Sequence, residues 1–76
     1  MQELVEFLAK GLVDDPNAVR VERTERDGAV VLELHVAADD VGKVIGRQGR
    51  IVRALRTVVR AAGARSNERT LLEIAA

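Results

Sequence analysis

The sequence has no cysteine, no tryptophan and no tyrosine, and it holds a single phenylalanine, Phe7, and a single proline, Pro16. Without cysteine the chain forms no disulfide framework and no thiolate metal site, and it offers no thiol nucleophile. One histidine and one serine remain, which leaves little for a nucleophile paired with a base. We therefore predict that the protein is not an enzyme and needs no cofactor.

Two pairs of adjacent carboxylates, Asp14-Asp15 and Asp39-Asp40, lie where one helix is expected to end and another to begin. We interpret them as turn and cap residues. No spacing of histidine and acidic residues indicates a metal site.

Long apolar runs are also absent, since none approaches the ~20 residues that a membrane span requires. The first residues lack the basic region and apolar stretch of a signal peptide. We expect a cytoplasmic protein with no membrane as partner. Of the 76 residues, 47% are hydrophobic and 32% are charged, so residues 1–76 are expected to fold as one small domain.

The formal net charge of zero hides a division along the chain. Residues 1–40 carry ten acidic side chains against four Lys or Arg, whereas residues 41–67 carry seven basic side chains and no acid. A basic block beside an acidic one indicates an anionic partner for the middle of the chain. A solvated helix face is the alternative explanation. The seven basic residues are Lys43, Arg47, Arg50, Arg53, Arg56, Arg60 and Arg65.

Apolar residues recur at helical spacing over residues 2–12, which predicts a short amphipathic helix with Phe7 in the core. Two strands follow, residues 18–26 and 29–36, with Asp27-Gly28 between them as a hairpin turn. Alternation in the second strand places Val31, Glu33 and His35 on its open face.

The remaining elements are two helices and a strand. Asp39 and Asp40 are candidate N-caps for a short helix over about residues 40–45. A longer helix is predicted over about residues 50–62, with Gly63 as its C-cap, and a last strand over residues 70–74. The predicted core stripe of the longer helix is Ile51, Leu55, Val58, Val59 and Ala62. Three strands with helices on one face make a two-layer α+β domain of order α-β-β-α-α-β.

The stretch Val44-Ile45-Gly46-Arg47-Gln48-Gly49-Arg50 joins the two helices. Glycine has no Cβ, so the two glycines permit a sharp turn and the close approach of another backbone. The longer helix begins directly behind this turn, and a helix N-terminus attracts anions because its amides are unpaired and its dipole is positive there. These are the features of a phosphodiester-binding loop, although a bare G-x-x-G pattern is also compatible with a simple turn between helices.

The hexapeptide Val44–Gly49, between a short and a long helix, resembles the signature of KH domains, which bind single-stranded nucleic acid. The element order, with an extra helix and strand before a core at about residues 29–75, is similar to the type II KH arrangement. Over nearly its whole length the chain resembles the small bacterial single-KH proteins of the KhpA (YlqC-like) type. The hairpin at Asp27-Gly28 and the element order predict a three-stranded mixed sheet with three helices on one face. The resemblance to the KhpA type also implies a homodimer, or a heterodimer with a larger KH protein of the Jag (KhpB) type.

In KH domains the G-x-x-G loop clamps the backbone of about four nucleotides, and the bases lie in an adjacent groove. By resemblance, one wall of the groove is the clamp with its flanking helices, and the other is the strand carrying Leu34, His35 and Val36. One of Val44 and Ile45 belongs to the core and the other to the groove, and both assignments remain open. The RNA-binding residues implied are Gly46, Arg47, Gln48, Gly49, Lys43, Ile45, Arg50 and Arg53.

Two functional hypotheses follow. The first is an RNA-binding protein, a post-transcriptional regulator or RNA chaperone-like factor, that clamps single-stranded RNA at the loop. Single-stranded DNA is an alternative ligand, and without Tyr or Trp to stack on we expect weak discrimination among bases. The second is a protein-interaction module that uses the fold for dimerisation and binds little RNA, with Arg53, Arg56 and Arg60 facing acidic protein. Salt-dependent binding of short RNAs separates the two.

Overall fold

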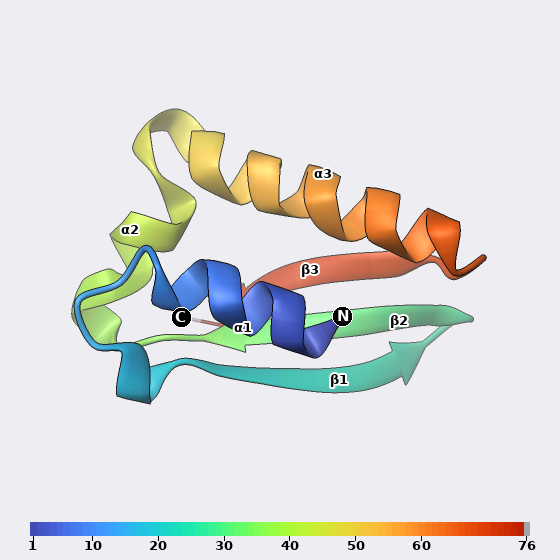
Figure 1. The fold of residues 1–76 in the computed structure, drawn as a ribbon, viewed down its shortest axis with the longest axis horizontal. Helices are drawn as coiled ribbons and strands as arrows, with labels where there is room; N and C mark the ends of the chain where they lie inside the picture. The colour runs from blue at the N-terminus through green and yellow to red at the C-terminus, as the bar shows by residue number, and fades with distance from the viewer. Residues whose placement is uncertain (76) are drawn as a thin grey trace.

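A computed structural model describes residues 1–75 and shows three helices packed on one face of a three-stranded sheet (Figure 1). The elements follow the predicted order, so the two-layer α+β arrangement of a type II KH domain is confirmed. Single 3-10 turns lie at Pro16–Ala18, Ala38–Asp40 and Arg47–Gly49. The helices and strands are α1 (Gln2–Lys10), β1 (Arg20–Arg26), β2 (Ala29–His35), α2 (Val41–Ile45), α3 (Arg50–Arg65) and β3 (Thr70–Ala75).

The sheet is mixed, as predicted, with β2 at its centre. β1 pairs with β2 in antiparallel register from Arg20 opposite His35 to Arg26 opposite Ala29. β3 runs parallel to β2 on its other side. The hairpin predicted at Asp27-Gly28 is present, and both of its residues have positive φ, 55° and 79°.

The core lies between the sheet and the helices, and its largest fully buried side chains include Leu32, Leu34 and Val59. Val31 is also buried, at 2% exposure, although alternation puts it on the open face of the sheet. The strand register explains this burial, because it places an ion pair over the side chain of Val31. Arg26 lies opposite Ala29 and Glu73 lies opposite Glu33, and their side chains meet at 2.9 Å across the central strand.

The end of α3 differs from the prediction. The helix continues to Arg65, and Gly63 is a buried residue inside it rather than its C-cap. A Cβ at position 63 would lie 2.5 Å from Thr70 Oγ1 and 2.7 Å from the Glu68 carbonyl oxygen. The Glu68 amide donates to the Gly63 carbonyl at 2.8 Å, so the chain returns closely past this point. Glycine is needed here because β3 begins against the helix backbone.

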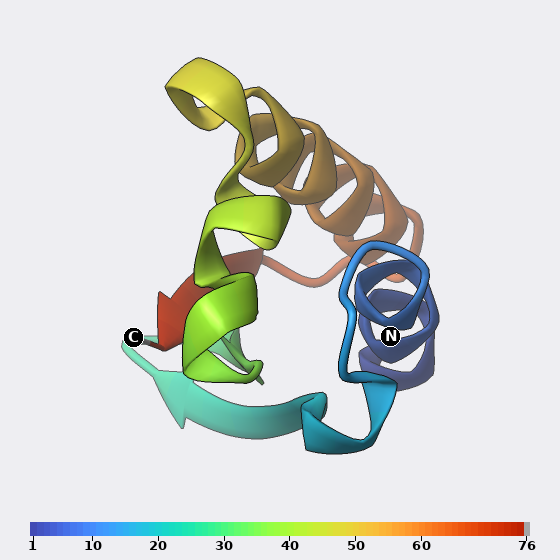
Figure 2. The same ribbon diagram turned by 90° about the vertical axis from the view of Figure 1, so that its left-hand side faces the viewer.

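The buried face of α3 is also rotated from the predicted stripe. Leu55 and Val59 are buried as expected, but Val52 is buried at 7% exposure whereas Val58 is 41% exposed. The helix packs on β3 and α2. Figure 2 shows β3 under one side of α3 and α1 under the other. Val58 is therefore left uncovered.

The exposure of Phe7 is a second departure, because the single aromatic side chain was expected in the core. It is 75% exposed, while Val5 and Ala9 are the buried residues of α1. The helix ends at Lys10, two residues before the predicted limit.

Candidate nucleic-acid interface

The G-x-x-G turn connects α2 to α3 at one end of the molecule (Figures 1 and 2). Gly46 has φ 77° and ψ 171°, a conformation essentially restricted to glycine. A Cβ on it would lie 2.6 Å from Cγ1 of Ile51. Gly49 also has positive φ, 73°, but a Cβ there would meet nothing closer than 3.8 Å. The first glycine is thus required by conformation and by packing, and the second by conformation alone.

Two hydrogen bonds fix the shape of the turn. The Gly49 amide donates to the Gly46 carbonyl at 3.1 Å, and Nη2 of Arg53 donates to the Gln48 carbonyl at 3.0 Å. Gln48 itself has a left-handed backbone with φ 56°. The side chains of Arg47 and Gln48 are exposed, so the turn presents both of them to solvent.

The helix that follows carries no counter-charge at its start. α3 has 16 residues, its first turn contains no acid, and its N-cap, Gly49, provides no side-chain cap. Its first amides and its dipole therefore remain available to an anion. Arg50 is exposed at the same place, next to Arg47 of the turn.

The structure distinguishes the two apolar residues before the turn. Val44 is fully buried in the core, and Ile45 is only partly buried. Ile45 is therefore the one that can contact a ligand.

Of the residues predicted for the second wall of the groove, Leu34 is fully buried and cannot line an open groove, whereas Val36 is partly buried. His35 lies on the opposite face of the sheet, where Nε2 is 2.8 Å from Oε1 of Glu33 and 3.7 Å from Oε1 of Glu22. These three side chains could hold a metal ion by their spacing, but Arg20 already neutralises Glu22 at 2.9 Å.

The strand beside α3 is β3, and a shallow groove separates the second half of α3 from it. Arg56 spans the groove, since its Nε donates to the Leu72 carbonyl at 3.3 Å. Arg69, absent from the predicted set, joins Arg56 and Arg60 on the groove walls. The sequence contained one signal for it, a basic residue directly before the last strand.

Lys43 is the predicted site residue whose charge is already neutralised. Its Nζ lies 2.7 Å from Oδ2 of Asp14 and 3.3 Å from Oδ1 of Asp40. Asp40 is 2% exposed, makes no N-cap hydrogen bond, and instead accepts the Asp15 amide at 3.0 Å. That amide, with the Asp14 amide and Lys43, holds the pKa of Asp40 below 3.8 against the opposing effect of burial. Hydrogen bonds to Asp14 and then Asp40 raise the pKa of Lys43 above 10.5.

Fold and loop together define a KH domain, and comparison with known proteins shows which group it joins. The model of the KhpA/KhpB KH-domain family matches residues 2–74. The chain belongs to this family, which is one of RNA-binding proteins rather than enzymes. No solved structure matches the chain. Within residues 1–75, the helices are too short or too polar to cross a bilayer.

Several bacterial relatives cover almost the full chain. RNA-binding protein KhpA of Clostridium perfringens is 50% identical over 74 residues, 97% of this chain and 99% of the relative. The same protein of Clostridium acetobutylicum is 49% identical over the same shares of both chains. KhpA of Aquifex aeolicus is 49% identical over 97% of this chain and 94% of its own length.

Proposed function

We propose that this protein binds single-stranded RNA and clamps its backbone at the G-x-x-G turn. The observation that carries the proposal is the exposure of Arg47 and Gln48 on a rigid turn, directly before the uncapped start of α3. The relatives named RNA-binding protein KhpA support the same class of ligand.

Each part of the turn has a distinct role in this proposal. Gly46 and Gly49 let the phosphodiester backbone approach the turn closely. The guanidinium group of Arg47 and the amide of Gln48 donate to phosphate oxygens. Arg50 adds a second cation at the start of α3. Arg53 braces the turn through the Gln48 carbonyl and turns its remaining donors toward the ligand.

The bases lie along the groove in this account. Ile45 offers them an apolar contact at the turn. Beyond the turn, along the second half of α3, β3 forms the far wall, where Arg56, Arg60 and Arg69 line the groove together with one acid, Glu68. Within residues 1–75 there is no aromatic side chain in this groove, so contacts with the bases are weak and sequence preference is low.

We further propose that the protein acts as a cytoplasmic post-transcriptional regulator or RNA chaperone-like factor, with residues 1–76 as a single KH domain. A domain that clamps about four nucleotides and discriminates weakly among bases suits a broad set of transcripts. Two linked sites would raise its avidity through effective concentration.

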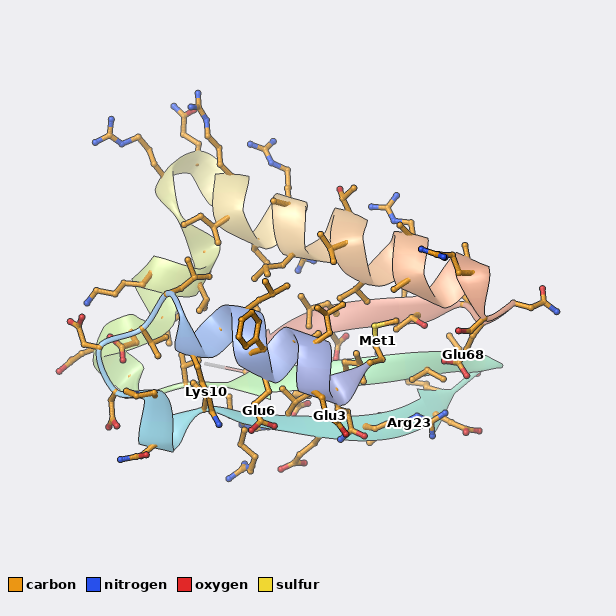
Figure 3. All side chains as sticks on the ribbon, viewed as in Figure 1. Met1, Glu3, Glu6, Lys10, Arg23 and Glu68 are labelled. Carbon is orange, nitrogen blue, oxygen red and sulfur yellow. The ribbon has the colours of Figure 1, made fainter. Side chains whose placement is uncertain are left out.

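The proposal of a partner rests on an apolar surface between α1 and α3. Val58 is its most exposed large residue, at 41%, and Phe7, at 75%, lies at its edge beside Glu3, Glu6 and Lys10. The charged side chains Glu3, Glu6 and Lys10 project from α1 on the side away from α3 (Figure 3). We propose that this surface pairs with a second copy or with a larger KhpB-type KH protein. The remaining apolar residues of this α1–α3 surface are Leu8, Leu12, Ile51, Ala54 and Leu55.

Binding of a short RNA at several salt concentrations tests the proposed function. Labelled single strands of about eight nucleotides, as RNA and as DNA of the same sequence, are titrated and followed by fluorescence anisotropy. We expect RNA affinity that falls with salt at a slope of about −0.7 for each phosphate contact. Equal binding of DNA would leave the clamp intact but make the ligand single-stranded nucleic acid in general. No salt-dependent binding of either strand would favour the protein-interaction module.

A further inference from the structure

Lys43 belongs to an ionic network that joins three separate segments of the chain. The segments are the turn after α1 with Asp14 and Asp15, the 3-10 turn that ends at Asp40, and α2 with Lys43 itself. Asp40 is their common point. One of its carboxylate oxygens accepts the Asp15 amide at 3.0 Å, and the other faces Lys43 at 3.3 Å.

The helix that carries Lys43 needs such a support. α2 has five residues, far fewer than an isolated helix requires for stability in water. Val44 anchors one side of it in the core. Lys43 anchors another side to Asp14 and Asp40. The next residues are Ile45 and Gly46, so the position of the G-x-x-G turn depends on how firmly α2 is held.

The charges of the network argue against a phosphate contact by Lys43. Two carboxylates surround one ammonium group, so the cluster of Asp14, Asp40 and Lys43 has a net charge of −1. A phosphate would have to draw Lys43 away from Asp40, a carboxylate that is 2% exposed. The side chain of Lys43 is 44% exposed, so the pair is half-buried, but drawing Lys43 away would still leave one oxygen of the buried Asp40 carboxylate without its cation.

We propose that Lys43 is a positioning residue, which holds α2 and with it the first glycine of the turn, and that it makes no contact with RNA. The proposal rests on the proposed function, because it assigns Lys43 a task in presenting that same turn. Asp40 shares the task from the other side of the ion pair.

The test compares Lys43→Met with Asp40→Asn in the RNA titration, at a temperature where circular dichroism shows both variants folded. Both variants should lower RNA affinity by at least ~3-fold, with sub-additive losses in the double variant, as for groups in one network. Neither should change the salt slope. The loss in Asp40→Asn is decisive, because removing a negative charge near a polyanion site strengthens binding if only the electrostatic field matters.

A flatter salt slope by about 0.7 in Lys43→Met, with tighter binding by Asp40→Asn, would overturn the proposal and make Lys43 a phosphate contact. If either variant fails to fold, Asp14→Asn and Lys43→Arg replace them, since both side chains are partly or fully exposed. Asp14→Asn should then give no gain in affinity, and Lys43→Arg should retain binding; a gain in Asp14→Asn contradicts the proposal.

A measurement without RNA separates this proposal from the proposed function. In the free protein, the amide resonances of Gly46 and Gly49 should shift in Lys43→Met and in Asp40→Asn, but not in the exposed variant Lys10→Met. Unmoved loop resonances would reject positioning. If the resonances move while the wild type binds no RNA, then the proposed function fails and the positioning role stands.

Discussion

The backbone of Gly46 lies directly against the side chain of Ile51. A Cβ added to Gly46 would be 2.6 Å from Cγ1 and 2.9 Å from Cβ of that isoleucine, at the first turn of α3. The contact closes the G-x-x-G turn, because Gly46 is its first residue and Ile51 follows it in α3. Packing of this kind fixes where the exposed residues between them point.

The first prediction compares the two glycines of the turn. Gly46→Ala should lower the free energy of unfolding by about 2–4 kcal/mol, since it adds a clash to a glycine-only conformation. Gly49→Ala should cost only about 1–2 kcal/mol, because its left-handed backbone is strained but its surroundings are open. Urea denaturation of both variants measures the difference. Equal losses would show that Ile51 does not constrain the turn.

The second prediction concerns two helical glycines with opposite surroundings. Gly63→Ala should destabilise the protein by about 1–3 kcal/mol, because the new methyl group would overlap Thr70 and the Glu68 carbonyl. Gly42→Ala is the matched control, since a Cβ there meets nothing within 4 Å. It should stabilise α2 by about 0.5–1 kcal/mol through helix propensity. Thermal melts should move in opposite directions, by roughly 4–8 °C for each kcal/mol.

Much of this fold follows from local sequence patterns. The hairpin at Asp27-Gly28, the alternation of β2 and the positions of Gly46 and Gly49 are dictated by residues close together in the chain. The buried face of α3 does not follow from local pattern alone, because apolar residues occupy more than half of the circumference of this helix. A helical stripe of apolar residues can include either Val52 or Val58. Val52 is the buried one because α3 packs on β3 rather than on α1.

Local sequence indicates only part of the surroundings of Lys43, because Asp40 lies three residues earlier but Asp14 does not lie nearby in the chain. Its nearest carboxylate belongs to Asp14, 29 residues earlier in the chain. A count of charges along the sequence assigned Lys43 to the basic block, whereas the fold places it among acids. The position of β3 beside α3 had no local signal either, because strand order is a property of the whole sheet.

The third prediction is a pH dependence from Asp40. Its pKa lies below 3.8 in the folded protein, so its charge stabilises the fold above that value and the contribution disappears as the pH falls through the folded pKa. The raised pKa of Lys43 keeps its own contribution intact up to 10.5. The difference in Tm between wild type and Asp40→Asn should therefore be constant from about pH 5 to 9 and shrink below about pH 4. A difference that vanishes near neutral pH would contradict the assignment.

The fourth prediction tests the α1–α3 surface. Val58→Glu should weaken self-association by at least ~30-fold, since a charge would enter the apolar centre of the interface. Leu71→Glu is the control, because Leu71 is 39% exposed on the opposite face of the sheet. Sedimentation velocity at tens of micromolar, with and without a KhpB-type partner, measures the effect. Equal dissociation in both variants, or a wild type that is always monomeric, would reject the surface.

The clamp itself is tested most directly by reversing the charge of the turn. Arg47→Asp with Gln48→Asp places two carboxylates where the phosphate should lie, while acids near the first turn of α3 suit its dipole. Stability should change by less than ~0.5 kcal/mol, as for most exposed substitutions. Lys10→Asp with Asn17→Asp is the matched control, because it changes the net charge by the same amount at exposed residues outside the proposed interface.

The deciding measurement is the affinity of both double variants for the same short RNA, by fluorescence anisotropy over a range of salt beside a thermal melt. The turn variant should bind at least ~10-fold more weakly than wild type, with a salt slope flatter by about one contact, and the control should stay within ~2-fold. If the turn variant melts like wild type and binds RNA equally well at every salt concentration, the G-x-x-G turn only connects two helices and the proposed function is wrong.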